Sequence, residues 1–463
     1  MGQTTARRAG VLAVLSAVIV TACSSGASPT PAPAATATAA PSTAAPTATA
    51  APSTAAPTAT AAPVTLTYLV PNDVPANVTR AQAMVDAYTA LHPNVSIQIE
   101  TRPGGGDGDN LVKTRLATGE MNDIFWYNSG SLLQPLNPAQ TLVDISGESF
   151  ISNINPSFLK TVSQGTAIFG VPSEPAMGGG ILYNKKVFAQ LGLQVPKTWA
   201  EFEANNDKIK AAGIAPVGAT FGDTWTSQLF VLADYYNVQL AAPDFAQKYT
   251  SNQAHYADTP AAEAGFKHLA EGFTKGWWQK DYGAAKLDDG LNLLAEGKIA
   301  QYPMLTFALG TIAQNHPDAI NDIGFFGQPG TDAAKAGMTI WMPNATYIAK
   351  TSKHVDEAKK FLAFIASVAG TEVETKAIAP SGPYVINGSK LPDDALPAVK
   401  DIQAYLDNNA ATPALEFWSP LKGPSLEQIT VAVGSGMNTA DEGAKLYDQD
   451  VTKQAKQLAL PGW

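Results

Sequence analysis

The feature that most restricts what this chain can fold into is a long segment built almost entirely from Ala, Pro, Thr and Ser. It covers residues 28–63, and within it the eleven residues APSTAAPTATA at 40–50 recur unchanged at 51–61. Such a composition supplies no large apolar side chains for a core. Frequent proline favours extended polyproline II at ~3.1 Å per residue, so the roughly forty residues after Cys23 reach on the order of 120 Å. We therefore predict a disordered tether over 24–63.

The residues before the tether have the order of a bacterial export signal. Arg7 and Arg8 precede an apolar run from Ala9 to Val20, which is too short to span a bilayer and predicts a signal peptide over 1–22. Cys23 is the only cysteine of the chain, and the sequence VTAC that ends in it resembles a lipobox. This resemblance implies acylation of Cys23 and a lipid-anchored protein. An ordinary signal peptide cut near Ala22 and a twin-arginine export route are the alternatives.

The folded part, residues 64–463, is long enough for two lobes with separate cores. Without Arg7 and Arg8, 28 of the 30 basic residues remain against 40 acidic ones, so its net charge is −12. Because phosphate binding needs clustered Lys and Arg, we expect no nucleic-acid partner. The eight Trp and fourteen Tyr suit both packed cores and the faces of sugars.

Local patterns predict α/β structure. Residues 64–70 form an apolar strand that ends at Pro71, a helical repeat follows, and the alternation at 95–99 predicts a second strand. This strand–helix–strand order favours a parallel sheet. A capping box at 198–201 opens a helix that continues to Ile209, and a further helix is predicted over 356–368, with Phe361, Leu362, Ile365 and Val368 on its buried stripe.

Several separated segments resemble the family 1 extracellular solute-binding proteins, the group that includes maltose-binding protein. They are ATGEMNDIFW at 117–126, with Asn122 in place of the usual Pro, FGVP at 169–172, LYNK at 182–185, PKTW at 196–199, EGKIA at 296–300, and the stretches 341–349 and 426–463. The resemblance extends over nearly all of residues 64–463. It implies a type II periplasmic-binding-protein-like fold: two α/β lobes that close on a ligand in the cleft between them.

The same resemblance implies where the lobes divide. The N-terminal lobe is expected from 64–173 plus about 340–385, and the C-terminal lobe from about 176–335 plus 390–463. The chain is expected to cross between lobes near Glu174, again near 336–341 and again near 385–392. Gly178–Gly180, beside the first crossing, fit a hinge that needs unusual dihedral angles, or else close packing of strands.

A sugar site needs flat aromatic surfaces and polar groups that satisfy each buried hydroxyl. The predicted ligand-binding residues are Asn72, Asp73, Tyr127, Asn128, Glu174, Trp225, Phe307, Trp341 and Trp418. Some have structural alternatives: Asn72 and Asp73 suit a turn after Pro71, and Trp418 suits a core. Phe307 stands where the family commonly has a stacking Trp. Trp126 and the pair Trp277–Trp278 are expected to pack in the core.

These observations predict an exported lipoprotein, monomeric and without a cofactor, that binds a carbohydrate and delivers it to the permease of an ABC importer. The five His residues show no metal-binding spacing, no Gly-x-Ser-x-Gly elbow occurs, and the glycine-rich run at 104–108 lacks a phosphate-loop ending and is expected to form a loop. Two alternatives remain open: a lipid-anchored glycosidase, which needs a pair of carboxylates, and the same fold binding a polyamine.

Overall fold

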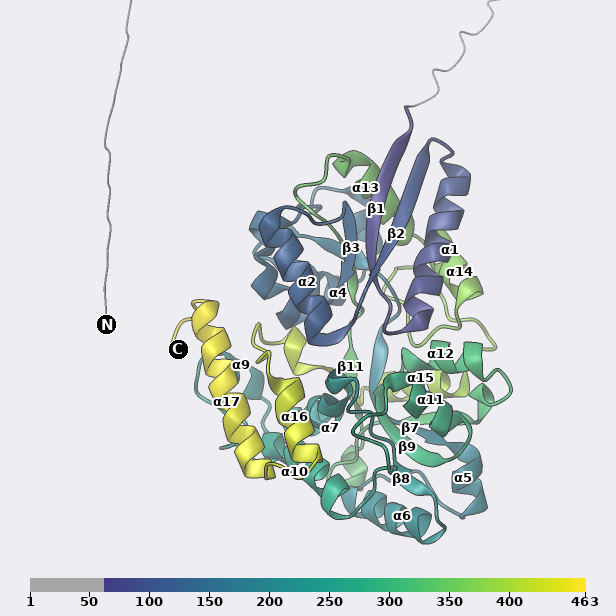
Figure 1. Cartoon of the computed structure of the whole chain (residues 1–463), viewed down its shortest axis with the longest axis vertical. Helices are drawn as coiled ribbons and strands as arrows, with labels where there is room; N and C mark the ends of the chain where they lie inside the picture. The colour runs from purple at the N-terminus through teal and green to yellow at the C-terminus, as the bar shows by residue number, and fades with distance from the viewer. Residues whose placement is uncertain (1–61) are drawn as a thin grey trace, which may run out of the picture. The chain divides into compact units, whose positions relative to one another are not determined.

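The computed structural model describes residues 62–463, which belong to one compact unit (Figure 1). The predicted signal peptide, Cys23 and all but the last two residues of the predicted tether lie outside the described residues. Among residues 62–463, no helix combines the length and the apolar character needed to cross a membrane.

The first sheet has five strands in the order β2-β1-β3-β12-β6. The strands are β1 (Val64–Pro71), β2 (Val95–Arg102), β3 (Ile124–Tyr127), β6 (Gly170–Pro172) and β12 (Ala345–Ile348). β1 pairs in parallel with both β2 and β3, as the sequence predicted. β12 runs antiparallel to β3 and β6, so the expectation of a parallel sheet is wrong at this edge. β1 and β3 end at the space between the sheets, whereas β12 begins there, because the chain reaches β12 directly from β11 of the second sheet. β12 therefore runs in the opposite direction.

The second sheet is built around the long strand β7 (Met177–Asn184). β9 pairs with one edge of β7, while β11 and β10 pair with successive parts of the other edge, all three antiparallel. The strands are β8 (Ala215–Val217), β9 (Ile299–Leu305), β10 (Ile323–Phe326), β11 (Met338–Trp341) and β13 (Ala411–Pro413). A separate small ribbon joins β4 (Ser163–Gln164) to β5 (Ala167–Ile168).

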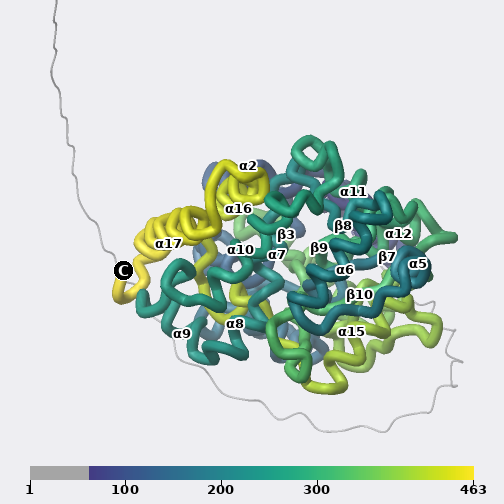
Figure 2. The backbone as a smooth tube through the Cα atoms, turned by 90° about the horizontal axis from the view of Figure 1, so that it is seen from below, coloured from purple at the N-terminus to yellow at the C-terminus, as the bar shows by residue number. Residues whose placement is uncertain are grey.

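Helices cover both sheets. Around the first sheet lie α1 (Pro75–Leu91), α2 (Gly105–Thr118), α3 (Pro138–Thr141), α4 (Pro156–Leu159), α13 (Val355–Ile365) and α14 (Val368–Ala377). The others are α5 (Lys185–Gln190), α6 (Trp199–Ala211), α7 (Leu229–Leu232), α8 (Tyr235–Ala241), α9 (Phe245–Thr250), α10 (Pro260–Thr274), α11 (Leu287–Ala295), α12 (Ala308–Asn315), α15 (Pro397–Asp407), α16 (Leu426–Gly434) and α17 (Ala440–Gln457). Figure 2 shows α5, α6, α11, α12 and α15 around β7, β8, β9 and β10, with α8, α9, α10, α16 and α17 to one side.

The chain passes directly between the sheets at two places. Residues 173–176 lead from β6 to β7, and residues 342–344 lead from β11 back to β12. The first passage agrees with the position expected near Glu174. The second lies just beyond the expected range 336–341, because β11 extends to Trp341 within the second sheet. A third transfer occurs between the end of α14 and the start of α15. The exact lobe boundaries stay a prediction.

Two local expectations need correction. The helix predicted over 356–368 ends at Ile365, and Val368 is 41% exposed and starts α14, where Ser367 Oγ accepts a hydrogen bond from the N–H of Gly370. The run at 104–108 is mostly helical rather than a loop, because α2 begins at Gly105. Of the capping box predicted at 198–201, one half is present: Thr198 Oγ1 accepts from the N–H of Glu201 at 3.3 Å, whereas the Glu201 carboxylate accepts from the N–H of Lys197 rather than from that of Thr198.

The glycines at 178–180 serve close packing rather than unusual dihedral angles. None of the three has a positive φ. A methyl group on Gly179 would lie 2.1 Å from Cζ3 of Trp341, and one on Gly180 would lie 2.4 Å from the carbonyl oxygen of Phe326. The strand therefore needs glycine where neighbouring side chains and backbone press against it.

Candidate functional site

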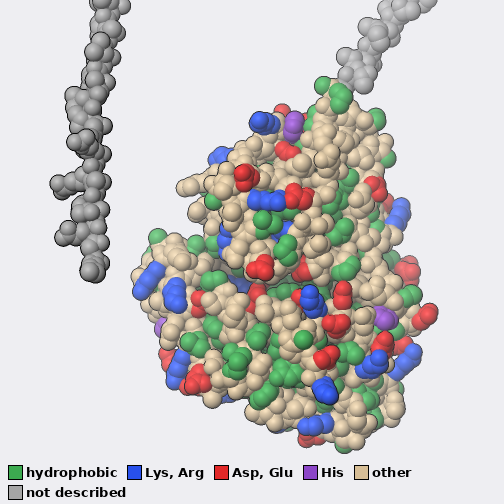
Figure 3. Space-filling model, viewed as in Figure 1, with side chains coloured by type: hydrophobic (Ala, Val, Ile, Leu, Met, Phe, Trp, Pro, Cys, Tyr) green, Lys and Arg blue, Asp and Glu red, His purple; other side chains and the backbone are tan. Residues whose placement is uncertain are grey.

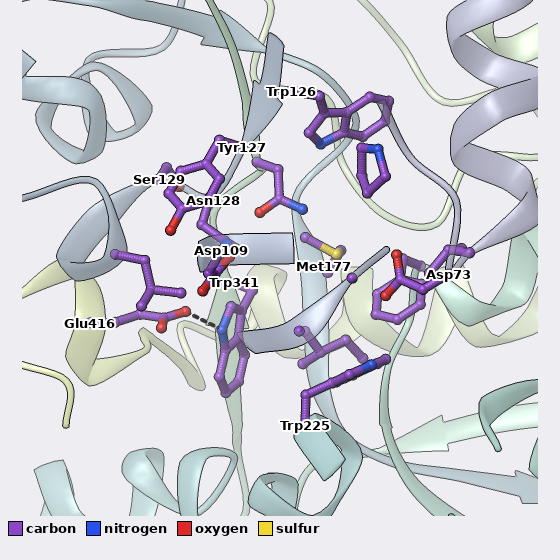
Figure 4. A pocket seen from close by; sticks show the side chains of 18 of the residues that line it. Asp73, Asp109, Trp126, Tyr127, Asn128, Ser129, Met177, Trp225, Trp341 and Glu416 are labelled. Atoms are coloured by element: carbon purple, nitrogen blue, oxygen red, sulfur yellow. Dashed lines mark hydrogen bonds between the residues drawn. The ribbon is translucent and has the colours of Figure 1, made fainter. Parts of the chain in front are cut away.

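A cavity of about 180 Å³ lies between the two sheets (Figure 4). Residues that follow β1, β2 and β3 meet there with residues from β7, β9 and β11 and from the C-terminal region. Its lining comprises Pro71, Asp73, Val74, Asn77, Arg102, Gly104, Gly105, Asp109, Trp126, Tyr127, Asn128, Ser129, Leu132, Glu174, Met177, Trp225, Gln228, Leu229, Leu232, Leu305, Phe307, Trp341, Met342, Asn344, Glu416, Phe417, Lys422 and Glu427. The cavity thus draws on segments from the whole length of residues 62–463.

Seven of the nine predicted ligand-binding residues line this cavity: Asp73, Tyr127, Asn128, Glu174, Trp225, Phe307 and Trp341. Their common position follows from topology, since strand ends of both sheets point to the space between them. Trp126 is buried in the core, as expected, at 1% exposure, and one side of it also faces the cavity. Trp277 is fully buried, as expected for a packing role.

The other two predicted residues lie elsewhere. Asn72 is exposed and continues the pairing of β1 with β2, donating its backbone N–H to the carbonyl of Arg102 at 2.9 Å. Trp418 is 58% exposed, so the alternative of a core tryptophan is wrong. Its Nε1 donates to the carbonyl of Pro413 at 3.1 Å, and it is absent from the cavity lining although its neighbours Glu416 and Phe417 belong to it. Contact of Trp418 with a ligand stays a prediction.

One wall of the cavity is held by Arg102, at the end of β2. Arg102 is 4% exposed; it donates from Nη1 to the carbonyl of Pro103 at 2.9 Å and from Nη2 to that of Trp126 at 3.2 Å. Its guanidinium carbon lies 5.7 Å from the centre of the Tyr127 ring, a cation–π distance. Burial lowers the pKa of Arg102, while the charges of Asp109, Tyr127 and Asp73 oppose that shift. Arg102 therefore places fixed positive charge between two carboxylates.

Asp73, which follows β1, and Asp109 of α2 flank this arginine. Burial raises the pKa of both carboxyl groups, and attraction to Arg102 offsets part of the rise. Asp73 lies so close to the start of α2 that a methyl group on Gly104 would be 1.8 Å from its Oδ2. A side chain at position 104 would therefore displace the Asp73 carboxylate from this place.

The opposite wall is aromatic. The rings of Trp225 and Phe307 have centroids 5.9 Å apart and form one tilted surface. Trp341 is 6% exposed, and its Nε1 donates to Oε1 of Glu416 at 2.5 Å, the bond drawn in Figure 4. Lys422 Nζ donates to Oε2 of the same carboxylate at 3.4 Å. Figure 4 shows Trp126 and Trp225 on opposite sides of the space.

Behind the cavity floor, Arg80 of α1 is shared by two buried carboxylates. Its Nε lies 2.7 Å from Oε1 of Glu374, and its Nη1 lies 3.7 Å from Oε2 of Glu174. Burial raises the pKa of Glu374 to about 7, and the nearby Arg80 limits the rise. Burial also raises the pKa of Glu174. One arginine faces two acids, so this cluster favours retention of one proton.

Four buried polar atoms of cavity residues lack a hydrogen-bond partner among residues 62–463. They are Nε of Arg102, Nε1 of Trp126, Oη of Tyr127 and Oε1 of Gln228. Buried polar atoms are normally paired, and leaving one unpaired costs about 1–3 kcal/mol. A bound molecule that both donates and accepts hydrogen bonds satisfies these atoms.

Several lining residues were missed in the sequence. Arg102 ends β2 just as Asn72 and Asp73 follow β1, so the strand-end rule that found Asp73 would have found it. Asp109 was passed over because its glycine-rich segment was expected to be a loop. For Glu416, Lys422 and Glu427 the sequence offers no signal, since they approach the cavity only through the packing of distant elements.

Two β-sheets, each covered by helices, are joined by direct passages of the chain and enclose a cavity between them. This arrangement defines the type II two-lobed fold of binding proteins. The model of the family described as "Bacterial extracellular solute-binding protein" matches residues 75–372. The chain therefore belongs to this family, whose members bind solutes outside the cell.

Known proteins agree with this assignment. The "Multiple sugar-binding protein" of Streptococcus mutans is 25% identical over 283 residues, which cover 59% of this chain and 64% of that protein's length. A solved chitin oligosaccharide binding protein superimposes with a TM-score of 0.74 at 20% identity, covering 85% of this chain and 99% of the other. RafE in complex with raffinose does so with a TM-score of 0.70 at 21% identity and the same coverage. At these identities the solved structures establish the fold.

Proposed function

We propose that this protein captures a carbohydrate outside the cell, an oligosaccharide in the first instance, and delivers it to the permease of an ABC importer. The observation that carries the proposal is the cavity between the sheets, which combines aromatic faces with buried, unsatisfied polar atoms. The names of the streptococcal relative and of the solved neighbours, which bind sugars, support it.

The chemistry of the cavity suits a sugar ring. A pyranose has an apolar C–H face and a rim of hydroxyl groups that each donate and accept hydrogen bonds. The surface formed by Trp225 and Phe307 supplies an apolar platform. Arg102, Trp126 and Tyr127 supply donors, and Asp73, Asp109 and Gln228 supply acceptors, from the other directions. The proposed ligand-binding set is therefore the seven predicted lining residues together with Arg102, Asp109, Gln228 and Glu427.

A calorimetric screen of mono- and oligosaccharides tests the proposal. At least one sugar should bind with a Kd in the micromolar range or below, equivalent to about 8 kcal/mol. Putrescine in the same screen tests the polyamine alternative, which the number of carboxylates in the lining keeps relevant. Binding of putrescine together with failure of every sugar would refute carbohydrate capture.

The glycosidase alternative is tested by incubation with the same oligosaccharides. A binding protein leaves them intact, so the concentration of reducing ends should stay at that of a protein-free control. Release of new reducing ends in proportion to protein concentration would replace the binding function by hydrolysis.

We also propose that acylated Cys23 anchors the protein at the outer face of the membrane, with the tether between anchor and binding unit. Cys23→Ala should release the protein into the soluble fraction while its melting temperature and affinity stay unchanged. Retention of this variant in the membrane fraction would contradict the anchor.

The mixed charges on the face shown in Figure 3 form no large basic patch there that would favour nucleic acid or an anionic lipid surface.

A further inference from the structure

The charges that line the cavity are unbalanced. Five carboxyl side chains, those of Asp73, Asp109, Glu174, Glu416 and Glu427, face two cationic ones, those of Arg102 and Lys422. Counting Arg80 and Glu374 behind the floor adds one charge of each sign. The proton that the Arg80 cluster retains reduces this excess from three negative charges to two, which is still unfavourable in a partly desolvated space unless something compensates it.

Two of the carboxylates are compensated by the protein itself. Glu416 accepts hydrogen bonds from Trp341 and Lys422. Glu174 faces Arg80 and accepts a hydrogen bond from the backbone N–H of Asn344 at 3.4 Å. These two groups need no charged ligand.

The other three are compensated only in part, because Asp73 and Asp109 share the single charge of Arg102. Within the part of the chain that the structure describes, Asp73, Asp109 and Glu427 form no ion pair within 4.0 Å, whereas Glu416 and Glu174 do. Arg102 lies near both aspartates but directs its two Nη atoms to backbone carbonyls. Only one oxygen of Glu427 accepts a hydrogen bond, from Thr224 Oγ1 at 2.6 Å. The Glu427 carboxylate lies near Gly105, at the start of α2.

Aromatic faces surround these unpaired carboxylates. Trp126, Tyr127, Trp225, Phe307 and Trp341 line the same space as these carboxylates, and Figure 4 shows Trp126 and Trp225 on opposite sides of it. Aromatic faces attract cations, most strongly where water is excluded. Carboxylates together with aromatic faces form the environment in which proteins bind ammonium groups. A hydroxyl group would also bond to the carboxylates, but it would leave the charge excess in place.

We infer that the preferred ligand is a saccharide that carries a protonated amino group, held near Asp109 and the facing carboxylates Asp73 and Glu427. This inference rests on the proposed carbohydrate function and specifies the substrate class within it. A neutral sugar would leave the excess negative charge of the lining uncompensated. A simple polyamine would leave the hydrogen-bond donors of the lining without partners.

The test uses sugars that differ in a single substituent. Glucose with glucosamine, galactose with galactosamine, and cellobiose with the β-1,4-linked glucosamine disaccharide form matched pairs, and the N-acetylated counterparts supply neutral nitrogen controls. Calorimetry at neutral pH and about 50 mM salt should give, in every pair that binds, a Kd about tenfold lower for the amine than for the neutral and acetylated forms. The preference should shrink at about 500 mM salt.

Asp109→Asn and Asp107→Asn form the matched pair of variants. Both residues belong to α2, but Asp107 is exposed and does not line the cavity. Asp109→Asn should lower the ratio of amine to neutral affinity by about fivefold or more, and Asp107→Asn should leave it within about twofold. The ratio cancels losses of folded protein and of hydrogen bonds common to both ligands.

The outcomes distinguish failure of the amino-group inference from failure of the proposed sugar-binding function. Equal or weaker binding of the amine in every pair that binds would overturn the inference and leave sugar capture intact. An unchanged ratio in Asp109→Asn would equally overturn the placement of the amino group. If no saccharide of any pair or of the wider screen binds, the proposed function itself fails and the inference falls with it.

Discussion

Gly179→Ala is expected to disturb the binding cavity through the back of Trp341. The added methyl group would lie 2.1 Å from Cζ3 and 2.5 Å from Cε3 of the indole ring, while carbon atoms in contact normally stay about 3.5–4.0 Å apart. The ring must therefore move by roughly 1–1.5 Å. A movement of that size breaks the 2.5 Å hydrogen bond from Nε1 of Trp341 to Glu416.

The magnitude follows from these two losses. Overpacking of a tight core typically costs about 1–3 kcal/mol, and loss of a hydrogen bond to a charged group costs about 1.5–3 kcal/mol. Because movement of the ring relieves part of the overlap, we expect a total of about 2–4 kcal/mol. At ~2.1 cal/mol/K per residue, a unit of about 400 residues then melts roughly 2–5 °C lower. Affinity should fall as well, since Trp341 lines the cavity.

Thermal denaturation and calorimetry with the best sugar from the screen measure both effects. Gly147→Ala is the control, because a methyl group there meets no atom within 4 Å and the backbone has no positive φ. In the Gly179→Ala background, Trp341→Leu should cost less than it does alone, with a coupling energy of about 1 kcal/mol or more. Additive effects, or a Gly179→Ala protein that melts like the control, would refute the contact.

Three further predictions concern other parts of the binding unit. Because burial raises the pKa of Glu374 from its ordinary 4.5 to about 7, the native state binds more protons than the unfolded state between these values. The melting temperature should therefore fall as pH rises from about 5 to about 8, and a Glu374→Gln variant with an equally steep slope would contradict this. Trp418→Ala should change stability by no more than about 0.5 kcal/mol, because the side chain is 58% exposed. If Trp418 stacks on an outer part of the ligand, calorimetry should show a loss of about five- to thirty-fold. Saturating ligand should reduce the radius of gyration in solution scattering, and an unchanged radius would count against closure of the lobes.

Local patterns were sufficient for the elements whose signals are local. The alternation at 95–99 gave β2, the cap at Thr198 gave α6, and strand ends led to Asp73 and Tyr127. These features depend on neighbours within a few residues in sequence. Strand β12 departs from the expected parallel arrangement because the strand before it in the chain, β11, belongs to the other sheet. The direction of β12 is therefore set by tertiary structure and not by its own sequence.

The glycine-rich start of α2 shows tertiary structure overriding propensity. Glycine is a poor helix former, so the run at 104–108 favours a loop by composition. In the fold, the Asp73 carboxylate occupies the space beside Gly104, the residue that precedes α2, and a side chain there would displace it. Gly104 therefore allows the Asp73 carboxylate to lie against the start of α2, the helix that carries Asp109.

Glu174 lines the cavity, and the protein itself supplies partners for its carboxylate. Glu174 stands close to prolines on both sides and was predicted to bind the ligand. In the fold, Glu174 accepts from the N–H of Asn344, and the N–H of adjacent Ser173 donates to the carbonyl of Asn344 at 3.0 Å. Ser173 and Asn344 belong to the two passages that connect the sheets. Glu174 therefore links these passages at the cavity floor, where Arg80 balances its charge. A ligand that draws on Glu174 would act directly on the segments about which the two lobes are expected to move.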